Sequence, residues 1–383
     1  MTVPLSPVLQ NQGVYPFVRL HQAAARVAAD GVEIIDFGAG DPRGEAEPFI
    51  QEALTRALRE TSGYPLAQGL PELREAIARW CARRFGAEID PDTQVIPTLG
   101  SKEAIFSFAQ VMLDPGSGRD TVVVTEPGYP VPERGARFAG ATVEQLPLRA
   151  PEFLPDLDEI AEETWERVAV LWLNYPNNPT GAVAPMELYE RLASLARERG
   201  FVLASDEAYS ELWFDEPPAS ALELADLRNV AVFNTLSKRS SMTGYRSGFV
   251  AGDPEIVSAL RLFRPSIGTA PQDFVQRASI AAWNDEAHVE RNRDRYRRRR
   301  ELLLDLFARK GLRLAGSRAT MYLWVEVPDG ETSEGFADRL LERGIVVAPG
   351  SYLGESGEGY VRFALVPDDD ACRRAAGILE ELL

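Results

Sequence analysis

Lys238 stands among hydroxyl-bearing residues and glycines in the stretch 234–248, and its amine could do covalent chemistry. Apolar residues at 230–233 precede this stretch and others at 249–251 follow it, so we expect the lysine on a connection at the end of strands. Open α/β sheets bind ligands at such ends. A primary amine in a partly desolvated site holds its proton less tightly and can attack an aldehyde to form a Schiff base.

Pyridoxal phosphate is an aldehyde of this kind, and it would need further groups around it. These are donors for its phosphate, a carboxylate for its ring nitrogen and partners for its phenolic oxygen. A lone Ser-Lys pair more often marks a solvated loop lysine. The interpretation therefore depends on what the rest of the chain provides.

Alternating strand and helix patterns could position such groups. Apolar stretches predict strands at 121–125, 142–146, 168–173 and 202–205, and amphipathic stretches predict helices at 130–138, 157–164 and 185–199. Parallel sheets covered on both faces have mostly apolar strands of this type. Polar loops with unusual composition follow three of the strands, at 126–130, 174–181 and 206–209.

Two glycine-containing turns could bind anionic groups through the backbone. Residues 95–112 predict a strand, then Gly100-Ser101, then a helix whose free N–H groups could bind a phosphate. The same pair also fits an ordinary helix cap. The turn Gly-Ala-Gly-Asp-Pro at 38–42 could present bare N–H groups to a carboxylate, or it could be a plain tight turn.

The pattern changes along the chain in a way that indicates two domains. Residues 1–13 predict an irregular arm, 272–307 a largely helical stretch with a break near 283–285, and the later strands and helices a smaller α+β domain. We expect residues 1–45 to form the arm and part of the small domain, 46–275 the large cofactor-binding domain, and 276–383 the small C-terminal domain.

Composition limits the possible partners. The 383 residues carry a net charge of −17, which argues against nucleic acid or an anionic membrane as partner. Cys81 and Cys372 are too few for a disulfide framework and indicate a reducing compartment. Because residues 1–12 lack a signal-peptide pattern and no apolar run has the length of a membrane span, we expect a cytoplasmic protein. No metal is expected.

Four motifs occur in a specific order: Asn-Asn-Pro-Thr-Gly at 177–181, Asp-Glu-Ala-Tyr at 206–209, Ser-Lys at 237–238 and Gly-Tyr-Arg at 244–246. With them the chain resembles the class I/II aminotransferases over nearly its whole length. The resemblance implies fold type I of the pyridoxal-phosphate enzymes, an α/β fold whose large domain has a mainly parallel sheet covered by helices, plus a smaller α+β domain. It also implies pyridoxal 5'-phosphate as cofactor and a homodimer with shared active sites.

The resemblance also implies a role for individual residues. Lys238 would form the Schiff base and move the proton between the substrate and the cofactor, and Asp206 would keep the ring nitrogen protonated. Tyr209 and Asn178 would hydrogen-bond the phenolic oxygen. Arg362 would bind the substrate α-carboxylate, assisted by Asn178 and the backbone of Gly38 and Ala39. The other implied cofactor-binding residues are Tyr129 on the ring, Gly100, Ser101, Lys102, Thr235, Ser237 and Arg246 at the phosphate, and Tyr64 from the neighbouring subunit.

The substrate is less well defined by the sequence. No second arginine is identified where aspartate-specific members bind a distal carboxylate, and the runs at 100–105 and 15–20 resemble the branch that acts on diaminopimelate precursors. We therefore expect N-succinyl-2-amino-6-oxopimelate as substrate with glutamate as amino donor, in lysine biosynthesis. Two alternatives remain: a broad-specificity aspartate, alanine or aromatic aminotransferase, and a pyridoxal-phosphate-dependent carbon–sulfur β-lyase.

Overall fold

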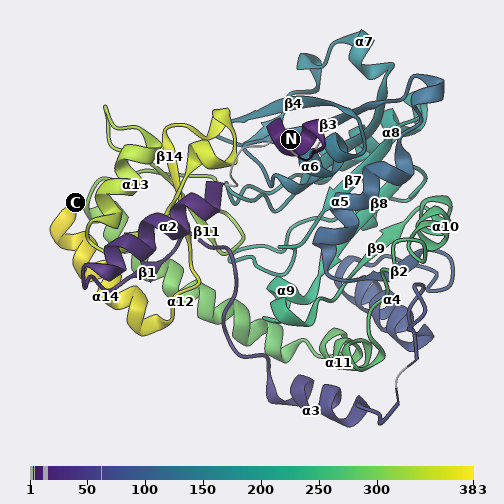
Figure 1. Ribbon diagram of the computed structural model, residues 1–383, viewed down its shortest axis with the longest axis horizontal. Coiled ribbons are helices and arrows are strands. Elements are labelled where there is room, and N and C mark those ends of the chain that lie inside the picture. Colours follow the sequence, from purple (N-terminus) through teal and green to yellow (C-terminus); the bar gives the residue numbers. More distant parts are fainter. Residues whose placement is uncertain (1–2, 4, 12–15, 62) are drawn as a thin grey trace.

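The computed structural model describes residues 3, 5–11, 16–61 and 63–383. Figure 1 shows a larger and a smaller part side by side, with the long helix α12 (Ala287–Arg309) running between them. An eight-stranded sheet organises the larger part, and a four-stranded sheet organises the smaller one. The run 15–20 was used above as a sign of the branch that acts on diaminopimelate precursors, and its first residue, Tyr15, lies outside the described residues.

The large sheet confirms the predicted mainly parallel α/β architecture. Its strands lie in the order β2 (Val95–Thr98), β9 (Gly248–Gly252), β8 (Val230–Thr235), β7 (Val202–Asp206), β6 (Val168–Asn174), β3 (Thr121–Glu126), β4 (Thr142–Arg149), β5 (Leu154–Pro155). The five strands from β8 to β4 are parallel, whereas β9 is antiparallel to both of its neighbours and β5 is antiparallel to β4. The carboxyl ends of the parallel strands therefore meet at one edge, which faces the small domain.

Helices cover both faces of this sheet because alternate strand side chains point to opposite sides. Val123 and Leu171 pack in one core with α4 (Pro71–Phe85), α8 (Met186–Arg199) and α11 (Asp273–Trp283). Val122 and Val170 pack in another core with α5 (Ser101–Met112), α6 (Val131–Phe138) and α10 (Pro254–Phe263). Helix α10 was not expected, although Asp253 caps it and Pro254 occupies its first turn, which is a recognisable start signal.

The small domain combines segments from both ends of the chain. Its antiparallel sheet contains β10 (Leu314–Ala315), β11 (Tyr322–Glu326), β14 (Tyr360–Ala364) and β13 (Ala348–Pro349), and β1 (Ile35–Asp36) pairs in parallel with β12 (Ile345–Val346). Helices α2 (Pro16–Ala29), α13 (Ser333–Leu341) and α14 (Asp369–Leu382) lie around these strands in Figure 1. The predicted smaller α+β domain is present.

Three sequence-based expectations need correction. Pro7–Asn11 form the short helix α1, not an irregular arm, and the expectation for residues 1–2, 4 and 12–13 lies outside the described part. The helix expected at 157–164 is interrupted, with a 3-10 turn at Leu157–Glu159 and α7 at Glu162–Trp165. The boundary after residue 275 falls inside α11, which packs in the large-domain core through Ala278 and Ala282. We propose that the division lies between α11 and α12.

Candidate active site

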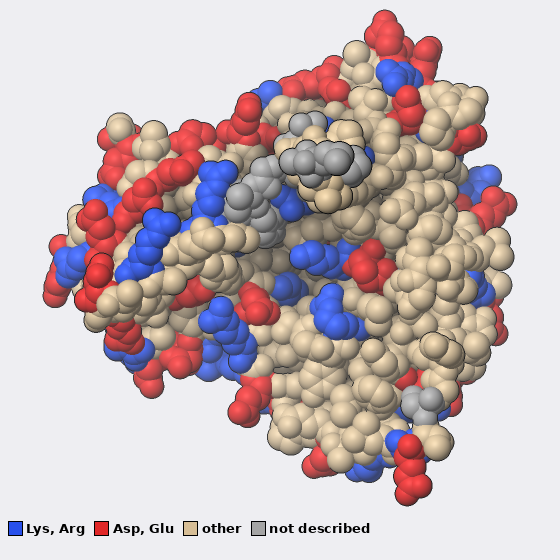
Figure 2. Space-filling model, in the orientation of Figure 1, with Lys and Arg blue, Asp and Glu red and all other residues tan. Residues whose placement is uncertain are grey.

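A cavity of about 550 Å³ lies between the two domains, at the carboxyl ends of the parallel strands. Large-domain residues such as Ser101, Asp206 and Lys238 line it together with the small-domain residues Tyr322 and Arg362. Figure 2 shows a hollow at the centre of this face, with Lys and Arg side chains gathered around it. Among the residues that the structure describes, no cluster of His, Cys, Asp and Glu could hold a metal ion, and no helix is long and apolar enough to cross a membrane.

Lys238 reaches the cavity from the one-turn helix α9 (Leu236–Arg239), which follows β8. The Thr235 side chain caps this helix by accepting from the Ser237 N–H at 3.1 Å, and Asn292 donates to the Lys238 carbonyl at 3.0 Å. The Lys238 amine donates to the Gly40 carbonyl at 2.6 Å. Desolvation lowers the pKa of Lys238 to about 8, so a useful fraction of the amine is neutral and nucleophilic near neutral pH.

Asp206 is the last residue of β7 and pairs in register with Asn174, the last residue of β6. The Asn174 amide donates to the Asp206 carbonyl at 2.9 Å, which joins the two strand ends. The Asp206 carboxylate accepts from the Ala208 N–H at 3.2 Å and lines the cavity. Burial raises its pKa to about 7, while the Ala208 N–H and Lys238 act in the opposite direction. A cation opposite this carboxylate would stabilise its charged form.

Donors for an anion gather at the start of α5. Gly100 caps this helix with a φ of 73°, and a Cβ at this position would lie 2.5 Å from Nη2 of Arg246. Arg246 itself has a left-handed backbone with φ 55°, and it donates to the Leu99 carbonyl at 3.0 Å. Desolvation, followed by the charges of Arg246 and Arg134, lowers the pKa of Lys102. Such a cationic cup at a helix N-terminus fits a phosphate dianion, with Ser101, Thr235 and Ser237 also lining the cavity.

Arg362 is held in β14 at the opposite side of the cavity, and its side chain is buried. It donates to Asn178 Oδ1 at 2.8 Å and to the Gly38 carbonyl at 2.7 Å, both neutral acceptors. Its Nε has no hydrogen-bond partner within the described part of the chain. A buried guanidinium without an acidic partner is costly, so this site favours a carboxylate ligand.

The sequence-predicted site residues do not all lie as expected. The N–H groups of Gly38 and Ala39 are not bare, because both donate to Asp36 Oδ1, at 2.8 and 3.3 Å. Gly38 instead offers its carbonyl to Arg362, and Ala39 lines the cavity. Tyr64 does not line the cavity of its own chain, and its side chain is fully exposed. The remaining predicted residues line the cavity or, for Gly100, border it.

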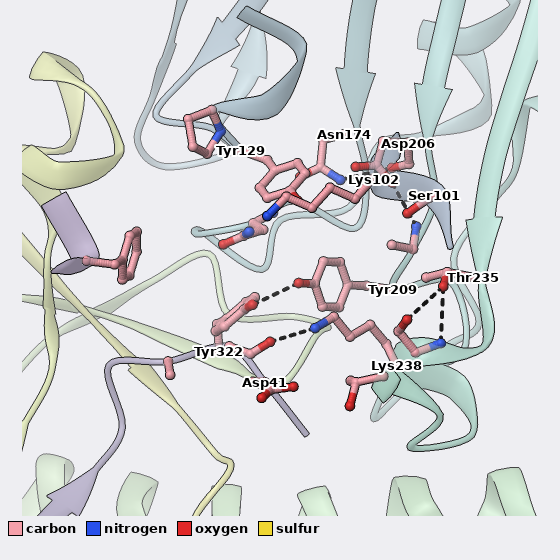
Figure 3. Close-up of a pocket in the computed structure, with 18 of the residues that line it drawn as sticks. Asp41, Ser101, Lys102, Tyr129, Asn174, Asp206, Tyr209, Thr235, Lys238 and Tyr322 are labelled. Carbon is pink, nitrogen blue, oxygen red and sulfur yellow. Dashed lines mark hydrogen bonds between the residues drawn. The ribbon is translucent and has the colours of Figure 1, made fainter. Parts of the chain in front are cut away.

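Several cavity residues were missed in the sequence. Asn174 could have been found, because it is a polar residue at the end of an apolar strand. Phe17 and Asp41 also line the cavity, and they lie in the run 15–20 and the turn 38–42, although neither was proposed as a site residue. Tyr322 lies on β11 of the small domain, and nothing in its local pattern indicates a site (Figure 3). Their importance depends on how the two domains meet.

The donor set fits pyridoxal phosphate. An amine of lowered pKa suits the aldehyde, a buried carboxylate suits the ring nitrogen, and the cationic cup suits the phosphate. A large, mainly parallel sheet with this site at the carboxyl ends of its parallel strands defines a pyridoxal-phosphate enzyme of fold type I.

Comparison with known proteins gives the family. Residues 32–379 match the aminotransferase class I and II family, and the chain belongs to it. A relative in Aquifex aeolicus (strain VF5), an LL-diaminopimelate aminotransferase, is 40% identical over 375 residues, 96% of each chain. An aminotransferase from Neisseria meningitidis Z2491 has a similar structure, with a TM-score of 0.91 at 38% identity over 99% of each chain. A probable N-succinyldiaminopimelate aminotransferase from Thermus thermophilus gives a TM-score of 0.89 at 33% identity, over 96% of this chain and 100% of that one.

The predictions of family, fold, reaction class and cofactor are thereby confirmed. The protein is a transaminase, and its cofactor is pyridoxal 5'-phosphate.

Proposed function

We propose that this aminotransferase moves an amino group between L-glutamate and a 2-oxo acid of the diaminopimelate type. Two relatives support the substrate class, since one is called an LL-diaminopimelate and the other a probable N-succinyldiaminopimelate aminotransferase. Both names describe a long substrate with a reacting amino-acid end and a further carboxylate at a distance. N-succinyl-2-amino-6-oxopimelate and the oxo acid of LL-diaminopimelate are the two candidates.

The observation that carries this proposal is that cationic side chains of both domains line the cavity. Arg362 is available for the carboxylate of the reacting end. Lys102 lines the same cavity from α5, where it can serve a distal carboxylate as well as the cofactor phosphate. A diacid would therefore find a cation for each of its ends.

The residues of the chain divide the chemistry among them. When bound between Lys238 and Asp206, the cofactor would supply a ring that withdraws electrons from the reacting carbon. Arg362 holds the α-carboxylate, and Asn178 keeps the guanidinium in place through its 2.8 Å hydrogen bond. Lys238 Nζ would be the base that takes the proton from the substrate Cα, and Asp206 would keep a proton on the ring nitrogen of the bound cofactor. Tyr209 donates to the phenolic oxygen.

A donor screen tests the substrate class. The cofactor-loaded enzyme is mixed with single amino acids, and the change of the cofactor absorbance band is followed. LL-diaminopimelate or its N-succinyl derivative should react about ten-fold or more faster than aspartate, alanine or phenylalanine at low concentration, since a second charge-assisted hydrogen bond contributes about 1.5–3 kcal/mol.

Other outcomes of the screen would indicate the alternatives. If aspartate or phenylalanine reacts fastest, the enzyme is a broad-specificity aminotransferase. Pyruvate formed from cystathionine would indicate β-lyase activity instead.

We also propose a homodimer in which Tyr64 completes the partner's site. Tyr64 is 102% exposed, and Leu66, Leu262 and Ile267 are also exposed apolar residues. The 64–70 segment contacts β2 at Pro97, and α10 contacts β2 through Arg261, which donates to the Val95 carbonyl. Exposed aromatic and aliphatic side chains of this kind favour a protein partner.

Subunit mixing tests this shared site. Lys238→Ala and Tyr64→Phe proteins form heterodimers in which one site carries both changes and the other carries neither. We expect activity above that of either parent, approaching about one quarter of the wild-type sites after full exchange. Tyr64→Phe alone should lose about ten-fold or more, because it loses a hydrogen bond to a charged phosphate.

A matched control pairs two changes that act within one chain. Mixing Lys238→Ala with Asp206→Asn leaves a defect in every site, so activity should not rise. If the Tyr64 mixture also fails to rise although its subunits exchange, Tyr64 does not serve the partner.

A further inference from the structure

Tyr322 occupies a central position between the functional residues of the two domains. It lies on β11 of the small domain, is almost fully buried and lines the cavity. Figure 3 shows its hydroxyl meeting that of Tyr209, which follows β7 of the large domain. The two oxygen atoms are 2.8 Å apart, and either could be the donor.

The role of Tyr209 decides the direction of this hydrogen bond. A tyrosine hydroxyl has one proton to donate. If Tyr209 donates its hydrogen bond to the phenolic oxygen of the cofactor, the Tyr209 oxygen must accept a hydrogen bond from Tyr322. Hydrogen bonds in such a chain strengthen one another, so Tyr322 makes Tyr209 a better donor.

The ring of Tyr322 supports a second functional residue. The guanidinium carbon of Arg362 lies 4.3 Å from the centroid of this ring, within cation–π range. Trp324, two residues further along β11, pairs directly with Arg362 on β14, so Tyr322 and Arg362 are diagonal neighbours on adjacent strands. The ring face of Tyr322 thus contacts Arg362, and its hydroxyl bonds Tyr209.

The 38–42 turn is shaped to accept this tyrosine. A Cβ on Gly40 would lie 2.1 Å from the Tyr322 hydroxyl oxygen, so only glycine allows the turn to come this close. The carbonyl of the same glycine accepts from Lys238 at 2.6 Å. Tyr322 is therefore packed against Arg362, Tyr209 and Gly40, and the Gly40 carbonyl in turn binds Lys238.

We propose that Tyr322 is a positioning residue that donates to Tyr209 and supports Arg362, and so links cofactor tuning to substrate binding across the domain boundary. This inference rests on the roles proposed above for Tyr209 and Arg362. The charged groups that face Tyr209 are Asp206 from β7 and Arg362 from β14, and Lys238 from α9 lies over its ring at 5.9 Å. Around Lys238 the charges are those of Asp41, Arg362, Arg246 and Asp206.

Tyr322→Phe removes the hydroxyl and keeps the ring, so it tests the role of the hydroxyl by itself. Without the hydrogen bond from Tyr322, Tyr209 stabilises negative charge on the phenolic oxygen less well. The nitrogen that links Lys238 to the cofactor therefore keeps its proton to higher pH. We expect the pKa of that link, read from the cofactor absorbance as pH is varied, to rise by about half a unit. The KM for the amino acid should stay near the wild-type value, because the ring still supports Arg362.

Tyr322→Leu removes the ring as well and should raise KM about five-fold or more, in addition to the pKa shift. Tyr175→Phe is the matched control, because its hydroxyl donates at 2.6 Å to the Phe153 carbonyl in an equally buried position outside the cavity. This control should lower Tm without moving the pKa of the link.

The cofactor-free protein gives an independent readout. Tyr209→Phe and Tyr322→Phe should each lower Tm, and the double variant should lose less than the sum, since one hydrogen bond is shared. Additive losses would overturn the proposed contact.

Comparing Tyr209→Phe with Tyr322→Phe distinguishes a wrong role for Tyr322 from a wrong role for Tyr209. A pKa that rises in Tyr209→Phe but not in Tyr322→Phe overturns the inference and leaves the role of Tyr209 intact. If neither variant shifts it, the proposed role of Tyr209 is wrong, and the inference fails with it.

Discussion

Replacing Lys238 with alanine is expected to reduce transamination by about 10⁴-fold or more, since both the covalent link to the cofactor and the base at the reacting carbon are lost. The cofactor should still bind, because Asp206, Arg246 and the start of α5 remain in place. The fold should remain too, since the hydrogen bond of the Lys238 amine within the described part of the chain goes to the Gly40 carbonyl at the cavity wall. Circular dichroism and Tm would verify this.

Reduction with borohydride shows which lysine holds the cofactor. The chain has three lysines, Lys102, Lys238 and Lys310, so peptide mapping distinguishes them without ambiguity. Reduced wild-type protein should carry the cofactor mass on the peptide that contains Lys238, and Lys238→Ala should carry none. Lys102→Ala is the matched control, because it also lines the cavity yet should keep the label. A label on Lys102 or Lys310 would disprove the assignment.

The strand ends of the large domain could be predicted because their signals are local. Apolar runs followed by polar residues mark the ends of β6, β7 and β8, and Asn178, Asp206 and Lys238 lie at or just after these ends. Such a parallel sheet brings its carboxyl ends together wherever its strands are correctly identified. The break between α11 and α12 was also visible in the sequence, at residues 283–285.

Local sequence patterns do not predict the contacts between the domains, because these contacts join residues far apart in sequence. The family resemblance placed Arg362 with Asn178, but it gave no role to Tyr322. Arg362 meets Asn178 across 184 positions, and Tyr209 meets Tyr322 across 113. No periodicity records such a pairing.

The N–H groups of Gly38 and Ala39, which donate to Asp36, are a different case. Asp36 stands two residues before Gly38, and an aspartate that bonds the backbone two residues on is a local turn signal that could have been used.

Replacing Asp206 with asparagine is expected to cost about 4 kcal/mol of transition-state stabilisation, or about a thousand-fold in kcat. An amide cannot hold the proton on the ring nitrogen, so the ring withdraws electrons from the substrate less effectively. Single-turnover measurements with glutamate would isolate this chemical step from product release. Cofactor affinity should fall as well, because the charge-assisted hydrogen bond becomes a neutral one.

The same substitution should have the opposite effect on the stability of the cofactor-free protein. Burial raises the pKa of Asp206 from 3.8 to about 7, so as pH rises through this window the unfolded chain releases its proton before the folded chain does. Stability is therefore lost between these two values, and above them the folded protein carries a buried charge. Asparagine removes this cost, since it does not ionise. We expect cofactor-free Asp206→Asn to have a higher Tm than the wild type at pH 8, with the difference closing as pH approaches 4.

Measured together, the two effects distinguish a functional carboxylate from a structural one. A more stable cofactor-free variant with strongly reduced turnover means that the wild type keeps a destabilising charge for the cofactor. Turnover near the wild-type value would show that Asp206 is not the partner of the ring. A lower Tm at pH 8 would show that the carboxylate stabilises the fold by itself, and its burial would then not be explained by the cofactor.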